Sequence, residues 1–470
     1  MTDAASGKLK FREKISYGFG DLASVLYWQT FMLYFTYFYT DVALIPAAAA
    51  ATMFLVSRLW DGVNDPVMGI IADRTNTRWG KFRPYMLWMS VPFAVVGVLT
   101  FTVPDFGLTG KLIWAYSTFI LIMMLYTAIN IPYTALLGVI SPDSIERTSV
   151  SSIKFIFAYA AGIIVSATLL PMVKIFGGDN EALGWQRSFM VFGVAFVIFF
   201  LIAFLGTKER VQPPKSQKSS IKKDLYELIT NKPWLILLGA TITFILFVAV
   251  RGSVTAHYFK YVIGEQELSL PFLSTRTYSF EVLVSAFNTV GQISSLLGVL
   301  IISWVAKKLG KKTTFMIFFV ISITSTAAFY LLSAQQLALI YLLQIAGSIT
   351  GGPLSVLLWA MYADTADYGE YKNGRRATGL IFSASTMSQK FGWAIGAYVA
   401  LTLMSQVGFQ PNVAQTQASL HGLILLFSLI PAGLGVLSMI LLAFYPLGDK
   451  KVEKMIEELN ERRESEENEF

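Results

Sequence analysis

The 470-residue sequence has no cysteine and only two histidines, His257 and His421. Without cysteine the chain can form no disulfide, thiolate metal site or cysteine nucleophile, and two histidines speak against a histidine-based zinc site. Charged residues are also scarce, at 14% of the chain, whereas 54% of residues are hydrophobic and the mean hydropathy is +0.57. Soluble proteins carry about 25% charged residues. This composition therefore argues against a soluble enzyme.

The small number of charges still includes a surplus of cations, with 37 Lys and Arg against 30 Asp and Glu. In a soluble protein this surplus of +7 would suggest a nucleic-acid partner. In a membrane protein, however, Lys and Arg collect in the cytoplasmic loops. Most of the cations fall on one side when the N-terminus is placed in the cytoplasm, so the surplus reflects topology and we expect no nucleic-acid partner.

Long apolar runs predict transmembrane helices, because a helix of about 20 residues crosses the hydrocarbon core with its backbone hydrogen bonds satisfied internally. We predict twelve spans, at 16–40, 46–72, 84–104, 111–140, 150–174, 186–206, 233–263, 280–306, 312–333, 335–362, 378–405 and 419–445. The longest polar interruption divides them into two six-helix bundles, 1–207 and 233–448, joined by a cytoplasmic linker, 208–232, and followed by a charged cytoplasmic tail, 449–470. This all-α, pseudo-symmetric layout is typical of alternating-access transporters.

Ionisable groups within a span are costly, so each one is a hypothesis of function. The second predicted span places Arg58, Asp61 and Asp65 on one helix face, with Asn64 at its edge. Two carboxylates one turn apart repel each other unless a cation lies between them, and Na⁺ prefers oxygen ligands. We therefore predict a cation site at Asp61 and Asp65. A structural Arg58–Asp61 ion pair is the alternative, but it leaves Asp65 unexplained.

Two other predicted spans carry polar groups that suit such a site. The eleventh contains a single lysine, Lys390, which we expect to neutralise the carboxylates when the cation has left. The fourth presents Tyr126, Asn130 and Thr134 on one face, with Thr127 next to Asn130. Hydroxyl and amide groups on one helix face are suited to binding a polar solute.

The first predicted span combines an acid with aromatic residues. Asp21 lies near its cytoplasmic end, and Trp28 is one of several rings that follow. Aromatic rings stack on the C–H faces of sugars, whose hydroxyls need polar partners. A sugar site is one interpretation, and an interfacial aromatic belt with Asp21 as a capping or gating residue is the other.

Five motifs occur in a family-specific order along the chain. They are Tyr17-Gly-Phe-Gly20, Phe38-Tyr39-Thr40-Asp41, Trp60-Asp61-x-x-Asn64-Asp65-Pro66-x-Met68-Gly69, Arg78-Trp79-Gly80-Lys81-Phe82-Arg83-Pro84 and Ala363-Asp364-x-x-Asp367-Tyr368-Gly369-Glu370. Together they resemble the glycoside–pentoside–hexuronide:cation symporters, and the resemblance covers nearly the whole chain. It implies the major facilitator fold and symport of a sugar or glycoside with Na⁺, Li⁺ or H⁺ by alternating access.

The resemblance also implies roles for individual residues. Asp61, Asp65 and Thr127 correspond to the family's cation site, Asn64 to an asparagine linked to sodium selectivity, and Lys390 to the lysine of helix 11. Arg58 joins Lys390 as a candidate coupling residue.

The sugar site departs from the melibiose carriers of the family. Their helix-4 aspartate is Asn130 here, and their sugar-binding aspartate of helix 1 falls at Val25, one turn from Asp21. A tryptophan of their sugar site matches Thr134, and Lys154 is an approximate counterpart of their helix-5 arginine. The galactoside specificity of those carriers therefore does not transfer. We expect the substrate contacts among Asp21, Trp28, Tyr126, Asn130, Thr134, Lys154 and Lys390, with Asn130 also near the cation.

The cytoplasmic motifs resemble the ion-paired loops that hold the inward gate of this superfamily closed. The candidate gating residues are Asp73, Arg74, Arg78, Asp364, Asp367, Glu370 and Arg375. The three acids of the second half are expected to form ion pairs with Lys372, Arg375 and Arg376.

The predicted function is cation-coupled import of a sugar or glycoside across a bacterial cytoplasmic membrane, with both termini inside. A lysolipid symporter of the same fold and a non-transporting membrane sensor are the alternatives. The sequence shows no nucleophile–base pair, metal motif or GxxxxGK[ST] phosphate loop, so we expect no enzyme activity and no cofactor besides the coupling cation. The expected partners are the sugar, the cation and the bilayer, and we expect a monomer.

Overall fold

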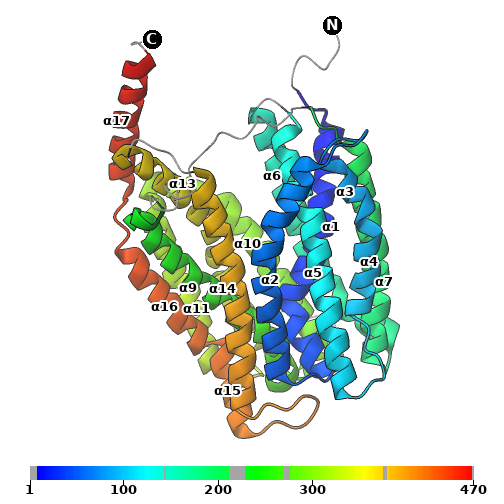
Figure 1. The fold of residues 1–470 in the computed structure, drawn as a ribbon. Helices are drawn as coiled ribbons and strands as arrows, with labels where there is room; N and C mark the ends of the chain where they lie inside the picture. Colours follow the sequence, from blue (N-terminus) through cyan, green and yellow to red (C-terminus); the bar gives the residue numbers. More distant parts are fainter. Residues whose placement is uncertain (1–7, 142–143, 211–227, 269–275, 374–377, 468–470) are drawn as a thin grey trace. The chain divides into compact units, whose positions relative to one another are not determined.

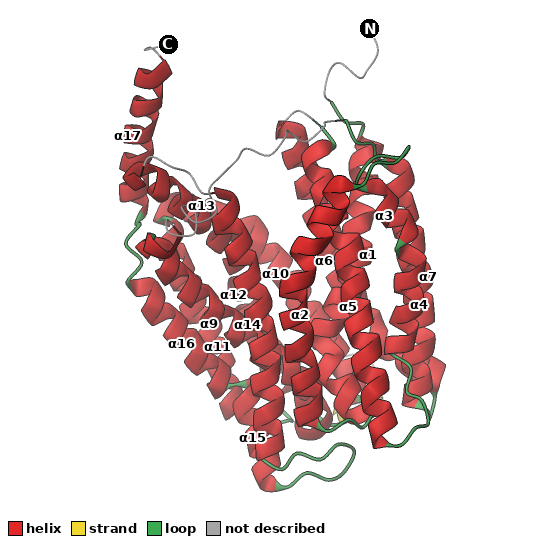
Figure 2. Ribbon diagram, viewed as in Figure 1, coloured by secondary structure: helices red, strands yellow, loops and turns green. Residues whose placement is uncertain are grey.

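The structure, a computed structural model of the chain, describes residues 8–141, 144–210, 228–268, 276–373 and 378–467. The described residues are helical nearly throughout (Figure 1; Figure 2). The chain divides into two compact units. Unit 1 comprises Met1–Lys215, Thr255–Thr289 and Leu401–Ser419, and unit 2 comprises Ser216–Val254, Val290–Ala400 and Leu420–Phe470.

Unit 1 contains the first half of the chain and two segments of the second half. Its elements from the first half are α1 (Phe11–Tyr37), the π-helix η2 (Phe38–Val42), α2 (Ala47–Arg74), α3 (Arg83–Trp88), α4 (Ser90–Thr100), α5 (Leu108–Val139), α6 (Ser144–Gly177) and α7 (Glu181–Gly206). The second half adds the π-helix η3 (Tyr258–Ile263) and the antiparallel hairpin of β1 (Gln266–Leu268) and β2 (Arg276–Tyr278). Helix α1 packs on α6 and α7.

Unit 2 holds the remaining helices, and its boundary with unit 1 falls within four of them. These four are α9 (Lys232–His257), α10 (Phe280–Leu309), α14 (Thr378–Gln406) and α15 (Gln417–Phe427). The others are α11 (Lys311–Ala328), the 3₁₀ turn η4 (Phe329–Leu331), α12 (Leu337–Gly351), α13 (Leu354–Asn373), α16 (Leu429–Ala443) and α17 (Asp449–Glu467).

Prolines explain where two of the predicted spans break into a pair of helices. A proline ring clashes with the carbonyl four residues earlier and provides no N–H for a helical hydrogen bond. Helix α3 ends at Trp88, four residues before Pro92, and α15 ends at Phe427, four residues before Pro431. By contrast, α5 continues through Pro132.

Helices lie in each of the twelve predicted ranges. Among the described residues, eight stretches are long and apolar enough to cross a membrane, namely Leu108–Val139, Ser149–Gly177, Glu181–Gly206, Lys232–Ile263, Phe280–Leu309, Lys311–Leu331, Leu337–Lys372 and Gln417–Ala443. The chain is thus a multi-pass membrane protein, while the full count of twelve spans stays a prediction.

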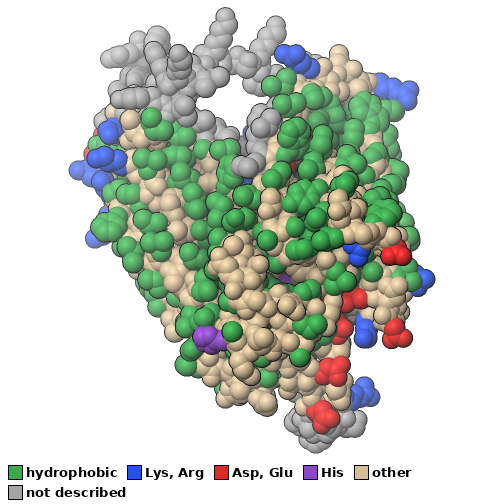
Figure 3. All heavy atoms as spheres, turned by 60° about the horizontal axis from the view of Figure 1, so that its bottom comes forward, with side chains coloured by type: hydrophobic (Ala, Val, Ile, Leu, Met, Phe, Trp, Pro, Cys, Tyr) green, Lys and Arg blue, Asp and Glu red, His purple; other side chains and the backbone are tan. Residues whose placement is uncertain are grey.

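The surface agrees with a membrane environment. Large apolar side chains are widely exposed, among them Leu331 at 80% and Ile175 at 77%. Hydrophobic side chains cover much of the face in Figure 3, and charged side chains occur in only a few places. Exposed apolar surface of this extent indicates contact with lipid rather than water.

The charged tail is better packed than its composition suggested. Helix α17 buries Val452, Met455 and Leu459 in the core of unit 2, and Glu458 accepts a hydrogen bond from Tyr371 of α13 at 2.7 Å. Its apolar face therefore covers protein, although the sequence analysis identified only a charged tail.

Candidate functional site

The predicted cation site lies where α2 faces α5 in unit 1. Asp61 is buried, with 2% of its surface exposed, and Asp65, one turn later, is half-buried. Thr127 of α5 is buried and donates a hydrogen bond to Asp65 Oδ1 at 2.9 Å. Asn64 is half-buried. The structure therefore brings an acid of α2 and a hydroxyl of α5 together, as the prediction of a shared site requires.

The predicted sugar contacts include an ion pair between α1 and α6. Lys154 Nζ lies 3.5 Å from Asp21 Oδ1, and the two side chains are 22% and 11% exposed. The ammonium group also lies 5.9 Å from the ring centre of Tyr133. Tyr133 and Tyr17 stack with centroids 4.6 Å apart, and each hydroxyl donates to the backbone carbonyl of the other residue, at 2.8 and 3.1 Å. This tyrosine pair fixes α1 against α5 beside the ion pair.

A pair of aromatic rings lies further along helices α1 and α5. Trp28 of α1 and Tyr126 of α5 are stacked, with ring centroids 5.7 Å apart and planes inclined by 23°. Asn130 is half-buried, and its Oδ1 lies 3.5 Å from the hydroxyl of Ser24. Thr134 is exposed. The stacked rings and the amide are suited to contacting the face and the hydroxyls of a sugar.

The roles of several other predicted residues stay predictions. Lys390 is half-buried on α14 in unit 2, and its approach to Asp61 and Asp65 stays a prediction. The side chains of Arg58 and Asp73 lie outside the described part of the structure, and Arg375 lies outside it altogether.

The predicted gating residues have different surroundings in the two units. In unit 1, Arg74 is exposed and the Arg78 guanidinium lies 4.4 Å from the ring centre of Trp79. In unit 2, Asp364 forms an ion pair with Lys311, the first residue of α11, at 2.6 Å. Lys311 was not among the partners predicted for Asp364. Asp367 and Glu370 follow Asp364 on α13, and their gating roles stay predictions.

Sequence reasoning missed a polar cluster at the predicted cytoplasmic end of unit 1. The Glu209 carboxylate accepts the backbone N–H groups of Lys81, Phe82 and Arg83 at 2.8 to 3.0 Å, which caps the turn before α3. Arg210 binds Glu13 through both guanidinium N–H groups, at 2.6 and 2.8 Å. This carboxylate raises the pKa of Arg210. The first residues of the predicted linker thus belong to unit 1.

A second ion pair lies at the same end, between α1 and α6. Lys14 Nζ lies 2.8 Å from Glu146 Oε2. Its hydrogen bond and that of the Leu9 backbone N–H lower the pKa of Glu146.

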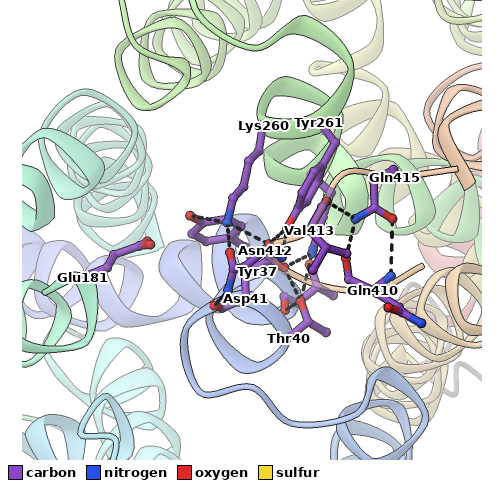
Figure 4. A network of polar contacts seen from close by, with 12 residues as sticks. Tyr37, Thr40, Asp41, Glu181, Lys260, Tyr261, Gln410, Asn412, Val413 and Gln415 are labelled. Atoms are coloured by element: carbon purple, nitrogen blue, oxygen red, sulfur yellow. Dashed lines mark hydrogen bonds and ion pairs between the residues drawn. The ribbon is translucent and has the colours of Figure 1, made fainter. Parts of the chain in front are cut away.

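A network of polar contacts lies at the predicted external ends of the helices (Figure 4). We call Asp41, His257, Lys260, Tyr261 and Asn412 the outer cluster. The Asp41 side chain is fully buried and accepts from His257 Nε2 at 3.0 Å, from Lys260 Nζ at 2.9 Å and from the Tyr261 hydroxyl. Lys260 also donates to Asn412 Oδ1 at 2.6 Å.

The motif that contains Asp41 was recognised in the sequence, but its partners were not. His257 was considered only as a metal ligand, and Lys260 was not named as a partner of Asp41. The available signal was that Asp41 and Lys260 lie at predicted span ends on the same side. Their separation of 219 residues hides the contact from any local pattern.

Comparisons with known proteins show the family of the chain. The family model for MFS/sugar transport proteins matches residues 16–449. The "Isoprimeverose transporter" of Lactiplantibacillus pentosus is 37% identical over 459 residues, covering 97% of this chain and 92% of the relative. The "Putative glycoside/cation symporter YagG" of Escherichia coli (strain K12) is 35% identical over 457 residues, covering 97% of this chain and 96% of the relative.

The fold has solved counterparts. A bacterial homologue of the human lysosomal transporter Spinster, solved in an inward-facing and unoccupied conformation, superimposes with a TM-score of 0.66 over 92% of this chain and 96% of its own, at 12% identity. That likeness shows the major facilitator fold. The family model and the two relatives show more, and the predicted resemblance is confirmed. The chain is a member of the MFS/sugar transport protein family, in its glycoside–cation symporter branch, and is a transporter rather than an enzyme.

Proposed function

We propose that the protein imports a sugar or glycoside together with a monovalent cation by alternating access. The observation that carries this proposal is the hydrogen bond from Thr127 to Asp65, which joins α2 and α5 beside the buried Asp61. Carboxylate and hydroxyl oxygens are ligands for a hard cation, and a carboxylate can instead take up a proton.

The membrane potential is a sufficient energy source for such a cycle. Moving one positive charge inward across 100 mV provides about 2.3 kcal/mol, which supports a roughly 50-fold solute gradient. The predicted coupling ions are Na⁺, Li⁺ and H⁺, and Lys390 is the proposed counter-charge when the ion site is vacant. The excess of Lys and Arg in the predicted cytoplasmic loops supports the proposal that both termini lie inside.

The substrate site is proposed between the Asp21–Lys154 pair and the Trp28–Tyr126 rings. Because Lys154 is already paired with Asp21, the two charges compensate each other where a sugar would bind. This compensation favours a neutral sugar or glycoside over an acidic one. The lysolipid alternative is not favoured, since the two relatives described above are named for glycosides and isoprimeverose.

Uptake by proteoliposomes tests this function. We expect purified protein to accumulate radiolabelled isoprimeverose or another neutral glycoside when a Na⁺, Li⁺ or H⁺ gradient is imposed, and to accumulate a glucuronide less well. Asp61→Asn and Asp65→Asn should abolish ion-driven accumulation but retain sugar exchange between equal internal and external concentrations.

The matched control is Asp105→Asn, which removes an exposed acid from the loop before α5. It should leave accumulation unchanged. Normal ion-driven uptake by both the Asp61 and the Asp65 variants would contradict the proposed cation site. Failure of all tested sugars, together with transport of a lysolipid, would contradict the proposed substrate class.

A further inference from the structure

The outer cluster has no part in the cation or sugar contacts, yet it joins three distant segments of unit 1. Asp41 lies on η2 after α1, Lys260 and Tyr261 lie on η3 after α9, and Asn412 lies in the segment after α14. The first segment comes from the N-terminal half of the chain and the other two from the C-terminal half. In a transporter of this fold, the halves must separate at the outer end for solute to enter. The cluster therefore lies where separation has to occur.

The backbone is specialised at each of the three positions. The two π-helical segments of the described chain, η2 and η3, are the ones that carry Asp41, Lys260 and Tyr261. Such wide turns re-aim side chains and frequently occur at functional sites. Asn412 has a left-handed φ of +59°, a conformation that asparagine tolerates better than most residues.

The left-handed turn lets Asn412 use its backbone and its side chain together. Its N–H donates to the Tyr261 hydroxyl at 2.8 Å, and its side-chain amide donates to the Asp41 carbonyl at 2.6 Å. Gln415 supports this turn by bonding to Gln410, as Figure 4 shows. One asparagine thereby connects both helix ends.

The chemistry of the cluster favours reversible closure. A buried carboxylate held by an ammonium group, an imidazole and a hydroxyl makes charge-assisted, directional bonds. Because 16% of the Lys260 side chain is exposed, water can solvate its ammonium group when the cluster opens. Interlocked apolar side chains would instead expose new apolar surface to water whenever the halves part.

We propose that the outer cluster is the latch that closes the external entrance of the transport pathway and is released in every cycle. The proposal rests on the proposed function and adds positioning residues to it. Asp41 is the centre of the latch, Lys260 is its counter-charge, His257 is a hydrogen-bond partner of Asp41, and Asn412 brings the segment after α14 onto it.

The absence of native cysteine allows a side-specific test. Ser285 of α10 is 4% exposed and lies between two contacts of α10 with α1, Phe280 with Tyr37 and Asn288 with Tyr34. A Ser285→Cys reporter would therefore be shielded while the latch is closed. The measurement is its rate of labelling in intact cells by a membrane-impermeant thiol reagent added from outside.

Breaking the latch should expose the reporter. We expect Asp41→Asn and Lys260→Gln to raise the labelling rate at least tenfold, and Lys260→Arg to stay near the rate of the reporter alone because it retains the cation. Tyr261→Phe removes only a hydroxyl and should raise the labelling rate less, about threefold. It keeps all charges, so it provides a test even if the charge-changing variants fail to fold.

Glu146→Gln is the matched control, because it breaks the Lys14–Glu146 pair at the opposite end of unit 1. Its labelling rate should not change. Unchanged labelling in Asp41→Asn, Lys260→Gln and Tyr261→Phe, or an equal rise in Glu146→Gln, would overturn the latch. Absence of sugar uptake by the unsubstituted protein would instead contradict the proposed function, so the two failures are distinguishable.

Discussion

At the scale of single residues, Thr127 has a more specific task than filling space. Its hydroxyl donates its one proton to Asp65, which orients the carboxylate and leaves the hydroxyl lone pairs available as ligands. The same contact explains why a threonine, rather than a valine of similar shape, suits this position of α5. Asp61 lies deeper, at 2% exposure, so a cation bound to both acids would be largely shielded from water.

Replacing that hydroxyl should weaken ion coupling without unfolding the protein. A hydrogen bond to a charged group contributes about 1.5 kcal/mol or more, which corresponds to about tenfold in affinity. We therefore expect Thr127→Val to raise the Na⁺ or Li⁺ concentration for half-maximal sugar uptake about tenfold at saturating sugar. Thr118→Val is the control, since Thr118 of α5 donates only to backbone carbonyls of its own helix. Equal effects of the two variants would remove Thr127 from the ion site.

At the scale of elements, the contact of α1 with α5 depends on a glycine. A Cβ atom at Gly20 would overlap the ring of Tyr133, which stacks on Tyr17. The ring and the two hydroxyl-to-carbonyl bonds hold these helices together next to the Asp21–Lys154 pair. Gly20, the second glycine of the first motif, is therefore required for packing, which the sequence alone did not show.

Enlarging this glycine should separate the two helices. Forcing extra volume into a packed interior costs about 1–3 kcal/mol, so Gly20→Ala should lower the melting temperature by several degrees and weaken sugar binding. Gly138→Ala on α5 is the control, because a Cβ atom there meets nothing within 4 Å. Thermal unfolding in detergent and sugar titration measure both effects. If Gly20→Ala were as stable as Gly138→Ala, the close approach would not limit packing.

The predicted elements also show where sequence patterns are sufficient and where they are not. Apolar runs located all twelve helical ranges because the bilayer requires each span to be apolar along its length. The same runs did not reveal that the ranges 84–104 and 419–445 each break into two helices. Hydropathy averages over a window, whereas Pro92 and Pro431 act on single hydrogen bonds.

At the scale of the whole molecule, the distribution of charge predicts the direction of insertion. The positive-inside rule predicts that the tail lies in the cytoplasm and the β1–β2 hairpin outside. We expect Glu267→Cys, at an exposed position of the hairpin, to be labelled by an impermeant thiol reagent in intact cells. Lys450→Cys, at the exposed second residue of α17, should be labelled only after permeabilisation.

The unsubstituted chain has no thiol and provides the blank for this measurement. The reverse pattern, with Lys450→Cys labelled from outside, would contradict the proposed orientation. It would also move the outer cluster to the cytoplasmic side.

The amino-acid sequence by itself determined the class of protein, the helical ranges and the candidate ions and sugar contacts. The length of apolar runs, the charges within them and the order of motifs are local or additive properties of the chain. They can therefore be recognised without a three-dimensional structure. Asp65 could be proposed as a ligand because a carboxylate within a span is costly and therefore indicates a function. Thr127 could be proposed because the family resemblance implies it.

Only the tertiary structure decided which distant groups meet. The bond from Lys260 to Asp41 joins residues 219 positions apart, and the one from Asn412 to Asp41 joins residues 371 positions apart. Neither contact has a local sequence signature, because packing of helix ends rather than periodicity brings these groups together. For the same reason the sequence predicts only a linker at Glu209, whereas its carboxylate binds the turn before α3.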